Sequence, residues 1–144
     1  MRLLLAALAV AAGSAPIPPA AVRAIDGRVA FRNYLPARVP AGFAYRGWSY
    51  RGGVLRVEFR SGSGPPLEWR VEPMHGACDA GAERSFQLGG NKVWWARRAR
   101  RQRAWRCVFD LAGKPLRLVA ASAAPPARLA PAGLGAVAAH AGRR

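Results

Sequence analysis

Short stretches in which apolar and charged residues alternate dominate the sequence between residues 54 and 120. In residues 54–60, for example, Leu55, Val57 and Phe59 alternate with arginine and glutamate. A period of two is typical of a β-strand that has one buried and one solvated face. Glycine, proline or serine separates each stretch from the next. The pattern predicts about seven short strands in an antiparallel meander.

The segment 92–110, KVWWARRARRQRAWRCVFD, contains the strongest local signals in this pattern. It is predicted to form two strands joined by an arginine-rich turn. In the second strand, Trp105, Cys107 and Phe109 would lie on one face because they are two residues apart. The segment is therefore expected to contribute both to the core and to the most highly charged part of the surface.

The apolar period changes near the C-terminus. From Ala130 onward, Leu134, Val137, Ala138 and Ala141 recur at helical spacing. Such a helix would be marginal alone and would need to pack on the sheet. The predicted fold class is therefore α+β, with a C-terminal helix on one face of an antiparallel meander sheet and one disulfide.

Residues 1–24 have the layout of a secretory signal peptide. A positively charged start precedes ten apolar residues, 3–12, and small residues follow. Cleavage is expected after Ala15 or after Ala24, and ten apolar residues are too few to span a bilayer. Residues 25–40 are expected to form an extended arm or linker, and residues 41–142 a single domain. The predicted location is secreted, periplasmic or in the cell envelope, with no transmembrane segment in the mature chain.

The two cysteines, Cys78 and Cys107, agree with export, because an even and small number of cysteines in an exported chain indicates a disulfide. Closing a loop of about 30 residues should stabilise the fold by about 3–4 kcal/mol. A metal site would need more ligands than these cysteines and the nearby His75. A catalytic cysteine would need a thiolate that is not in a disulfide. No metal and no cofactor are therefore expected.

Positive charge is concentrated in one part of the chain, whose formal net charge is +16. Between Lys92 and Arg117 there are nine basic residues and one acid, Asp110. Guanidinium groups bind phosphates and carboxylates with paired hydrogen bonds. The alternative is that the arginines accompany a composition rich in alanine, glycine and proline. The sequence leaves this choice open.

The hairpin within 92–110 is the predicted binding site for an anionic partner. The predicted binding residues are Arg97, Arg98, Arg100, Arg101, Arg103, Arg106 and Trp94. Trp94 is expected on the opposite face from Val93 and Trp95, where it could sit exposed beside the turn and contact sugars, lipid headgroups or bases. The other interpretation is a solvated loop in which Trp94 packs under the helix or against arginine stems.

No catalytic constellation is recognisable. None of the serines beyond the N-terminal segment lies in a nucleophile elbow, and His75 and His140 are the only histidines. The few acids are interleaved with arginines, which makes them ion-pair partners first. No phosphate-binding glycine motif and no metal-ligand spacing is present. The chain is therefore expected not to be an enzyme.

Several short motifs occur in a fixed order along the chain. They are LPARVPAGF at 35–43, GGNKVWW at 89–95, Ala-Trp at 104–105 and the small residues of the predicted terminal helix. This series resembles the extracytoplasmic "LPxGF/Y" domains of unknown function in bacterial envelope proteins, some of which are attached to anti-sigma-factor-like membrane segments. The resemblance covers residues 35 to about 142. It implies the fold and an extracytoplasmic location, but no catalytic residues, and this chain lacks the spanning segment of the membrane-attached versions.

Two functions are compatible with these features. The first is a non-catalytic envelope or extracellular domain that presents the arginine-rich hairpin to an acidic wall polymer, an anionic lipid surface or an acidic protein, with no specific nucleic-acid partner. Its binding would weaken steeply with salt. The alternative is a carrier or sensor that binds an apolar ligand in a groove between sheet and helix, lined by Trp69, Trp95 and Trp105. Such binding would tolerate salt and depend on the tryptophans.

Overall fold

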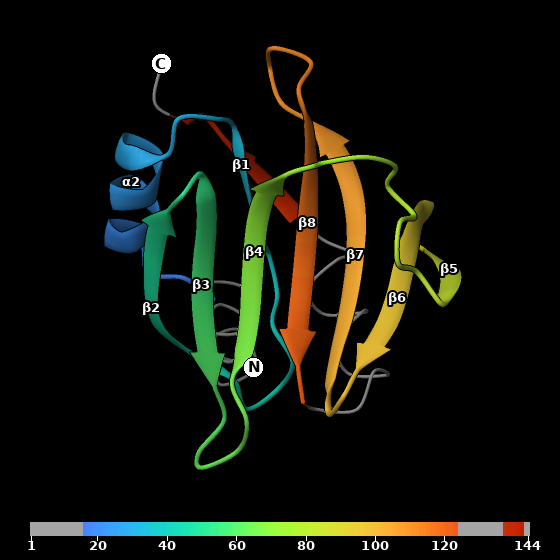
Figure 1. The fold of residues 1–144 in the computed structure, drawn as a ribbon. Coiled ribbons are helices and arrows are strands. Elements are labelled where there is room, and N and C mark those ends of the chain that lie inside the picture. The colour runs from blue at the N-terminus through green and yellow to red at the C-terminus, as the bar shows by residue number, and fades with distance from the viewer. Residues whose placement is uncertain (1–15, 124–136, 143–144) are drawn as a thin grey trace, which may run out of the picture.

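A computed structural model describes residues 16–123 and 137–142, and its main element is a seven-stranded antiparallel sheet (Figure 1). The strand order is β2-β3-β4-β8-β7-β6-β5. The strands are β2 (Ala44–Arg51), β3 (Val54–Arg60), β4 (Leu67–Pro73), β5 (Arg84–Leu88), β6 (Asn91–Arg98), β7 (Arg101–Phe109) and β8 (Pro115–Ser122). The predicted antiparallel sheet is therefore confirmed, and the alternating stretches at 54–60 and 67–72 are β3 and β4.

The strand order is not that of a single meander. Strands β2 to β4 form one hairpin-connected group and β5 to β8 form a second, and the two groups meet where β4 pairs with β8. Residues 74–83 connect the groups by passing in front of β8 and β7 in the view of Figure 1. Local turn signals specify which neighbours in sequence form hairpins, but they do not specify a pairing between strands as distant as β4 and β8.

One helix and two short strands form a second layer. They are α2 (Pro19–Arg28), β1 (Asn33–Pro36) and β9 (Val137–His140). Strands β1 and β9 pair with each other in a separate two-stranded antiparallel sheet, with Asn33 opposite His140. No helix within the described residues has the length and apolar character needed to cross a bilayer.

The expected C-terminal helix is wrong, and with it the α+β fold class. Residues 137–140 form a strand, while Ala130 and Leu134 lie outside the described residues. The structure is mostly sheet, and its short helix lies near the N-terminus, where a proline occupies the first turn. Alanine-rich sequence fits a helical period well, but a short helix of this kind is marginal alone. As a strand, residues 137–140 find hydrogen-bond partners in β1 instead.

Contacts with α2, with β1 and with the residues between them hold the segment 137–142 in place. The Asp26 carboxylate accepts a hydrogen bond from Asn33 Nδ2 at 2.9 Å, and its other oxygen lies 3.5 Å from His140 Nδ1. Beyond β9, a Cβ atom on Gly142 would overlap the carbonyl of Phe31, so only glycine allows this approach of two backbones. The segment 137–142 is thus fitted closely to the segment that follows α2.

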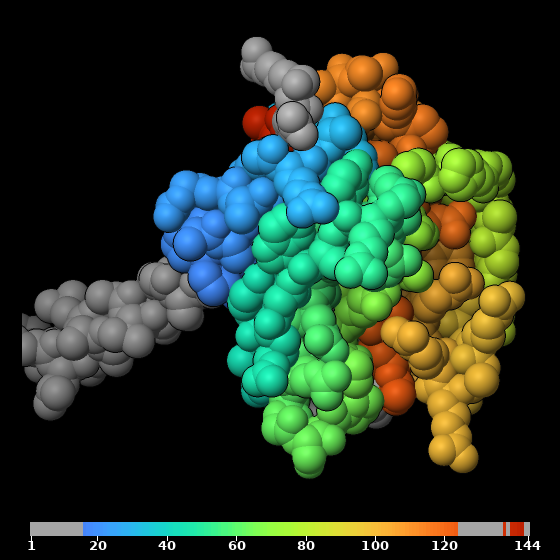
Figure 2. Space-filling view, turned by 60° about the vertical axis from the view of Figure 1, so that its left-hand side comes forward, coloured from blue at the N-terminus to red at the C-terminus, as the bar shows by residue number. Residues whose placement is uncertain are grey.

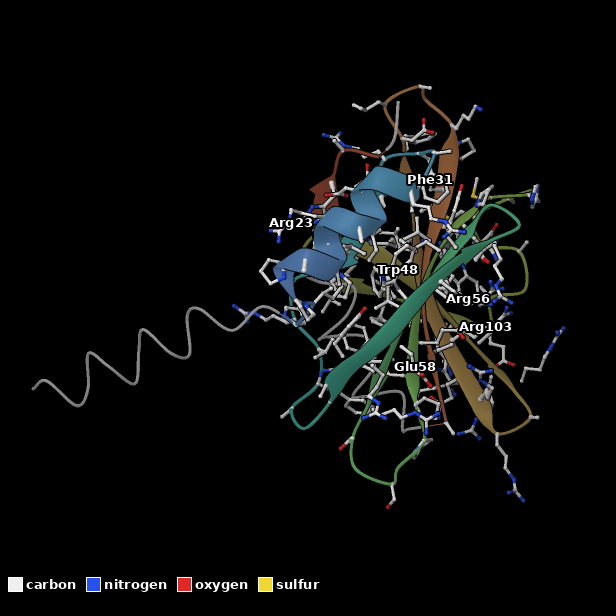
Figure 3. The ribbon with its side chains drawn as sticks, turned by 90° about the vertical axis from the view of Figure 1, so that its left-hand side faces the viewer. Arg23, Phe31, Trp48, Arg56, Glu58 and Arg103 are labelled. Carbon is white, nitrogen blue, oxygen red and sulfur yellow. A yellow bond between two sulfur atoms is a disulfide. The ribbon has the colours of Figure 1, made fainter. Side chains whose placement is uncertain are left out.

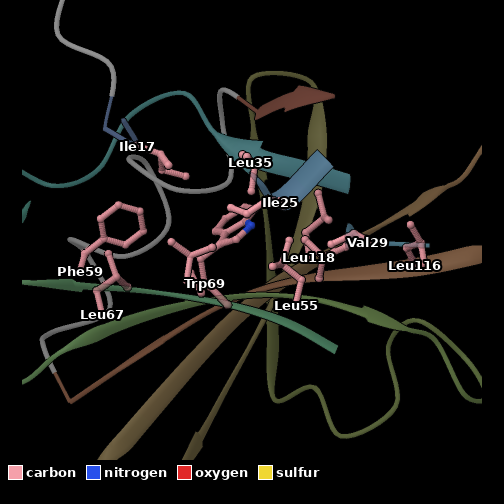
Figure 4. Close-up of a cluster of buried hydrophobic side chains, with 14 of the residues drawn as sticks. Ile17, Ile25, Val29, Leu35, Leu55, Phe59, Leu67, Trp69, Leu116 and Leu118 are labelled. Atoms are coloured by element: carbon pink, nitrogen blue, oxygen red, sulfur yellow. The ribbon is translucent and has the colours of Figure 1, made fainter. Parts of the chain in front are cut away.

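The core lies between this second layer and one face of the large sheet (Figure 4). From the second layer come Ile17, Ile25, Val29 and Leu35, each at most 3% exposed. From the sheet come Leu55, Val57, Phe59, Leu67, Trp69, Val71, Val93, Ala104, Leu116, Leu118 and Ala120. Residues 25–40, expected as an extended arm, therefore contain the end of α2 and β1 and supply three buried core side chains.

Trp69 connects the two layers. Its indole is 2% exposed, and its Nε1 donates a 2.9 Å hydrogen bond to the carbonyl oxygen of Tyr34 in β1. The Tyr34 hydroxyl in turn donates a 2.7 Å bond to the carbonyl oxygen of Phe109 at the end of β7. A buried indole N–H needs an acceptor. This directional hydrogen bond, together with apolar contact, therefore fixes the position of β1 over the sheet.

The face of the large sheet opposite α2 is called here the outer face. Its charged residues are Arg51, Arg56, Glu58, Arg60, Glu68, Arg70, Glu72, Lys92, Arg98, Arg101, Arg103 and Arg117, assigned by strand alternation and register. Figure 3 shows two of them, Arg56 and Arg103, on the side of the sheet away from Arg23 of α2. Charged residues outnumber apolar ones on this face, as the alternation predicts.

The disulfide between Cys78 and Cys107 is confirmed and attaches residues 74–83 to the outer face. Beneath this connection lies a small second core of Ala96, Trp105 and Val119. Trp105 is 1% exposed and donates a 2.7 Å hydrogen bond from Nε1 to the carbonyl oxygen of Cys78. The disulfide thus holds the connection over this small core and leaves the arginine-rich part of the outer face open.

Replacing Trp69 by phenylalanine should lower the free energy of unfolding by about 1–3 kcal/mol, because the Tyr34 carbonyl loses its donor and the core loses volume. Urea unfolding followed by circular dichroism measures the loss. Trp48→Phe is the matched control, since Trp48 is half-buried and its indole has no hydrogen-bond partner among the described residues. Equal losses in the two variants would contradict the role given to the Trp69 hydrogen bond.

Candidate anion-binding site

The β6–β7 hairpin places its arginines on two different faces. Arg98 and Arg101 are directly opposite each other at the last pair of the ladder, and Ala99 and Arg100 form the turn. Alternation puts Arg98, Arg101 and Arg103 on the outer face and Arg97 on the core side. In Figure 2 the tip of this hairpin projects from the body of the molecule. The predicted cluster is therefore divided by the register of the two strands.

An arginine from another strand joins the outer-face group. Arg70 of β4, together with Arg98, Arg101 and Arg103, lines a depression of about 250 Å³. Ala121 of β8 also lines it, and lies between Glu68 of β4 and Arg103 of β7 in register. Because a methyl group occupies this position, the long side chains on both sides surround an open space. Figure 2 shows β8 at the base of the surface between strands β3–β4 and the hairpin.

Positive charge in this depression is only partly compensated. Arg70 Nε lies 3.3 Å from Glu68 Oε1, although the N–H is not aligned for a hydrogen bond. Within the described residues, no carboxylate lies within 4.0 Å of the guanidinium groups of Arg98, Arg101 or Arg103. Three adjacent guanidinium groups without an acid partner form a site that favours anions.

Arg103 is surrounded by other positive charges, and its guanidinium carbon lies 5.6 Å from the centre of the Trp105 ring. Burial lowers the pKa of its guanidinium, and the positive charges of Arg70, Arg98 and Arg117 lower it further, while Glu72 acts in the opposite direction. Its Nε atom is buried and has no hydrogen-bond acceptor. A buried donor without an acceptor is unfavourable.

The remaining predicted residues lie away from the depression. Trp94 is half-buried opposite Trp105, near the disulfide, and Lys92 Nζ lies 4.6 Å from the centre of its ring. Arg106 is on the core side, where burial lowers its pKa and Tyr34 opposes that shift. The turn residue Arg100 is exposed at the tip. Trp94 therefore packs against a basic side chain rather than standing free beside the arginine-rich turn.

A larger groove continues from the depression across the outer face. Its volume is about 690 Å³, and it shares Arg101 with the depression. Arg56, Glu58 and Glu68 are among its lining residues. The carboxylates are already paired, since Glu58 Oε1 lies 3.0 Å from Arg60 and Glu68 Oε1 lies 3.3 Å from Arg70. The groove has both signs of charge, whereas the depression has an excess of positive charge.

The three tryptophans expected to line one groove do not share a surface. Trp69 lies on the core side and Trp105 on the outer face, and both are almost fully buried. Trp95 donates a 3.3 Å hydrogen bond from Nε1 to Gln102 Oε1. Each indole N–H thus has an acceptor within the fold, and the groove on the outer face is lined by other residues.

Sequence reasoning did not identify Arg70 or Ala121 as site residues. Arg70 alternates with the apolar Trp69 and Val71, a pattern that turns it outward, but its distance from the hairpin in sequence gave no sign of proximity. The pairing of β4 with β8, and of β8 with β7, brings them together. A small residue within an otherwise bulky outward-facing series was the only local signal at Ala121.

Comparison with protein-family models, with curated proteins and with solved structures finds no match to this chain. Function is therefore inferred from the residues of the site.

Replacing Ala99 by glycine should raise the free energy of unfolding by about 1 kcal/mol. Ala99 has φ of 55°, in the left-handed region that favours glycine. Ala112→Gly, in the exposed β7–β8 turn, is the control, because Ala112 has no positive φ and glycine there should be neutral or slightly destabilising. Thermal or urea unfolding measures both. An Ala99→Gly protein no more stable than the parent would contradict this view of the turn.

Proposed function

We propose that this protein is a non-catalytic domain of the cell envelope or extracellular space that binds an acidic polymer through the arginines of its outer face. The observation that supports it best is the group formed by Arg98, Arg101 and Arg103, which share one depression and have no carboxylate partner within the described residues. Composition alone would explain many arginines, but it would not bring residues of β4, β6 and β7 around a common open space.

A polymer fits this surface better than a compact protein partner. The depression and the groove meet at Arg101 and together extend over β3, β4 and β7. An extended chain with regularly spaced phosphate groups could lie along this path, with its charges near the arginines. Guanidinium groups suit phosphates because their paired N–H donors match two phosphate oxygens. An anionic lipid surface and an acidic protein are the competing partners in the binding experiment below.

Export is the second part of the proposal. The disulfide and the absence of a helix able to cross a bilayer among the described residues are compatible with an extracellular or periplasmic protein. The N-terminal layout of a signal peptide and the resemblance to extracytoplasmic "LPxGF/Y" domains point the same way. These features together favour an oxidising compartment, where acidic polymers of the wall or surface are accessible.

Signal cleavage is expected at or before Ala15, not after Ala24. Cleavage after Ala24 would remove Ile17, which is 3% exposed, and half of α2, and would put a charged amino group beside the fully buried Ile25. Mass spectrometry of the protein recovered after export identifies the new N-terminus. A mature chain that begins at Ile25 and is as stable as one that begins at Pro16 would contradict this expectation.

Removing charge at the hairpin should weaken binding and its salt dependence. The test variant replaces the outer-face arginines of the hairpin, Arg98, Arg101 and Arg103, by serine, and the control replaces three exposed arginines elsewhere, Arg23, Arg28 and Arg46. Binding to a phosphate-bearing wall polymer is measured at low and high salt, beside anionic and neutral vesicles and an acidic protein. We expect polymer binding to weaken as the salt concentration rises. We also expect the affinity for the polymer to fall about tenfold further in the hairpin variant than in the control.

Equal losses in the two variants would show that net charge alone attracts the polymer, and would refute a site. Stronger binding to anionic vesicles than to the polymer would transfer the proposal to a lipid surface and refute the polymer. No binding to any of the three would leave the arginines as a consequence of composition.

A further inference from the structure

The proposed polymer surface contains one position with distinct geometry. Arg70 from β4, Arg98 from β6, and Arg101 and Arg103 from β7 surround the depression above Ala121 of β8. These donors come from three strands and approach the space from more than one side. A surface that attracted anions only through its overall charge would not require such convergence.

We propose that this depression binds a single tetrahedral oxyanion group, a phosphate ester or a sulfate ester. The inference deepens the proposed function, because it assigns the group of the polymer that is recognised. At about 250 Å³ the depression is smaller than the roughly 300–1,000 Å³ typical of pockets for whole small molecules, so a single group of the polymer fits it better than a segment does. The groove of about 690 Å³ that begins at Arg101 would accommodate the part of the ligand that bears this group.

The number and direction of the donors favour a tetrahedral anion over a carboxylate. A carboxylate has two oxygens in one plane, and one guanidinium can satisfy both with paired hydrogen bonds. Four guanidinium groups around one space provide more donors than a carboxylate can accept. A phosphate or sulfate directs its oxygens in several directions and can therefore contact arginines of β4, β6 and β7 at the same time.

The arginines that line the depression are incompletely satisfied by the rest of the fold. The Nε atoms of Arg70 and Arg103 are buried without a hydrogen-bond acceptor. Glu68 lies close to Arg70 but compensates only one of the four charges. The lowered pKa of Arg103, caused by burial and by its three arginine neighbours, agrees with a cluster that is relieved by a bound anion.

A larger side chain in place of Ala121 would fill the depression without removing any charge. It is 2% exposed and forms the floor between β4 and β7. Leucine at this position would extend into the space that the anion occupies, and all of the arginines would be retained. Arg103→Gln is the second variant, because it keeps most of the side-chain volume at a half-buried position if Ala121→Leu does not fold. Arg97→Gln is the matched control for charge, since Arg97 lies on the other face of the same hairpin.

The experiment titrates the full chain with inorganic phosphate, sulfate and acetate at constant ionic strength, by calorimetry or by NMR of the arginine side chains. We expect saturable binding of phosphate or sulfate, and acetate weaker by about tenfold. Ala121→Leu and Arg103→Gln should each weaken phosphate binding by about tenfold, and Arg97→Gln by less than about twofold. Circular dichroism and urea unfolding confirm that each variant is folded.

Three outcomes would overturn the inference: no saturable binding of either oxyanion, equal binding of acetate, or an equal loss in Arg97→Gln. The polymer assay with the same variants separates it from the proposed function. Polymer binding that persists unchanged in Ala121→Leu, together with no phosphate binding by the parent, refutes the single-group site and leaves the polymer surface standing. Saturable phosphate binding without any polymer binding supports the site and refutes the polymer as the partner.

Discussion

The buried indole of Trp69 sets which residues of β4 face the core and which lie on the outer face. Its hydrogen bond to the Tyr34 carbonyl locates β1, and with it the whole second layer, over strands β4 and β8. Because side chains alternate along a strand, Trp69 on the core side requires Glu68 and Arg70 on the outer face. A shift of one residue in β4 would exchange these positions. The burial that stabilises the fold therefore also places Arg70 beside the hairpin arginines.

The outer face is divided between two roles by the connection at residues 74–83. The disulfide holds that connection over Trp105, so Trp105 and Val119 are shielded from water, whereas Phe109 at the end of β7 is 68% exposed. Closer to the hairpin turn, the same two strands contribute Arg103 and Ala121, which are not covered by the connection. The chain thus uses one face of one sheet for a small secondary core and for a charged surface, separated along the strand direction.

The sequence was sufficient to predict features that depend on near neighbours. Alternation identified β3 and β4 and their outward charges, and two cysteines in a chain expected to be exported identified the disulfide. It was insufficient where distant segments pair. Residues 137–140 have no local preference for a strand, and they form one because they pair with β1. Likewise, the hairpin arginines were visible in the sequence, but their division between two faces and the contribution of Arg70 follow from register and from the β4–β8 pairing.

The pairing of β1 with β9 also has a consequence for the order of folding. Asn33 and His140 lie near opposite ends of the chain, and their strands complete the layer that covers the core. During synthesis, β1 emerges from the ribosome long before β9, because all seven strands of the large sheet lie between them in the sequence. Until β9 has been added, β1 lacks its pairing partner, and the layer that covers the apolar face around Trp69 is incomplete. Pairing between segments so distant in sequence slows folding and prolongs the time during which this apolar surface is open to chaperones.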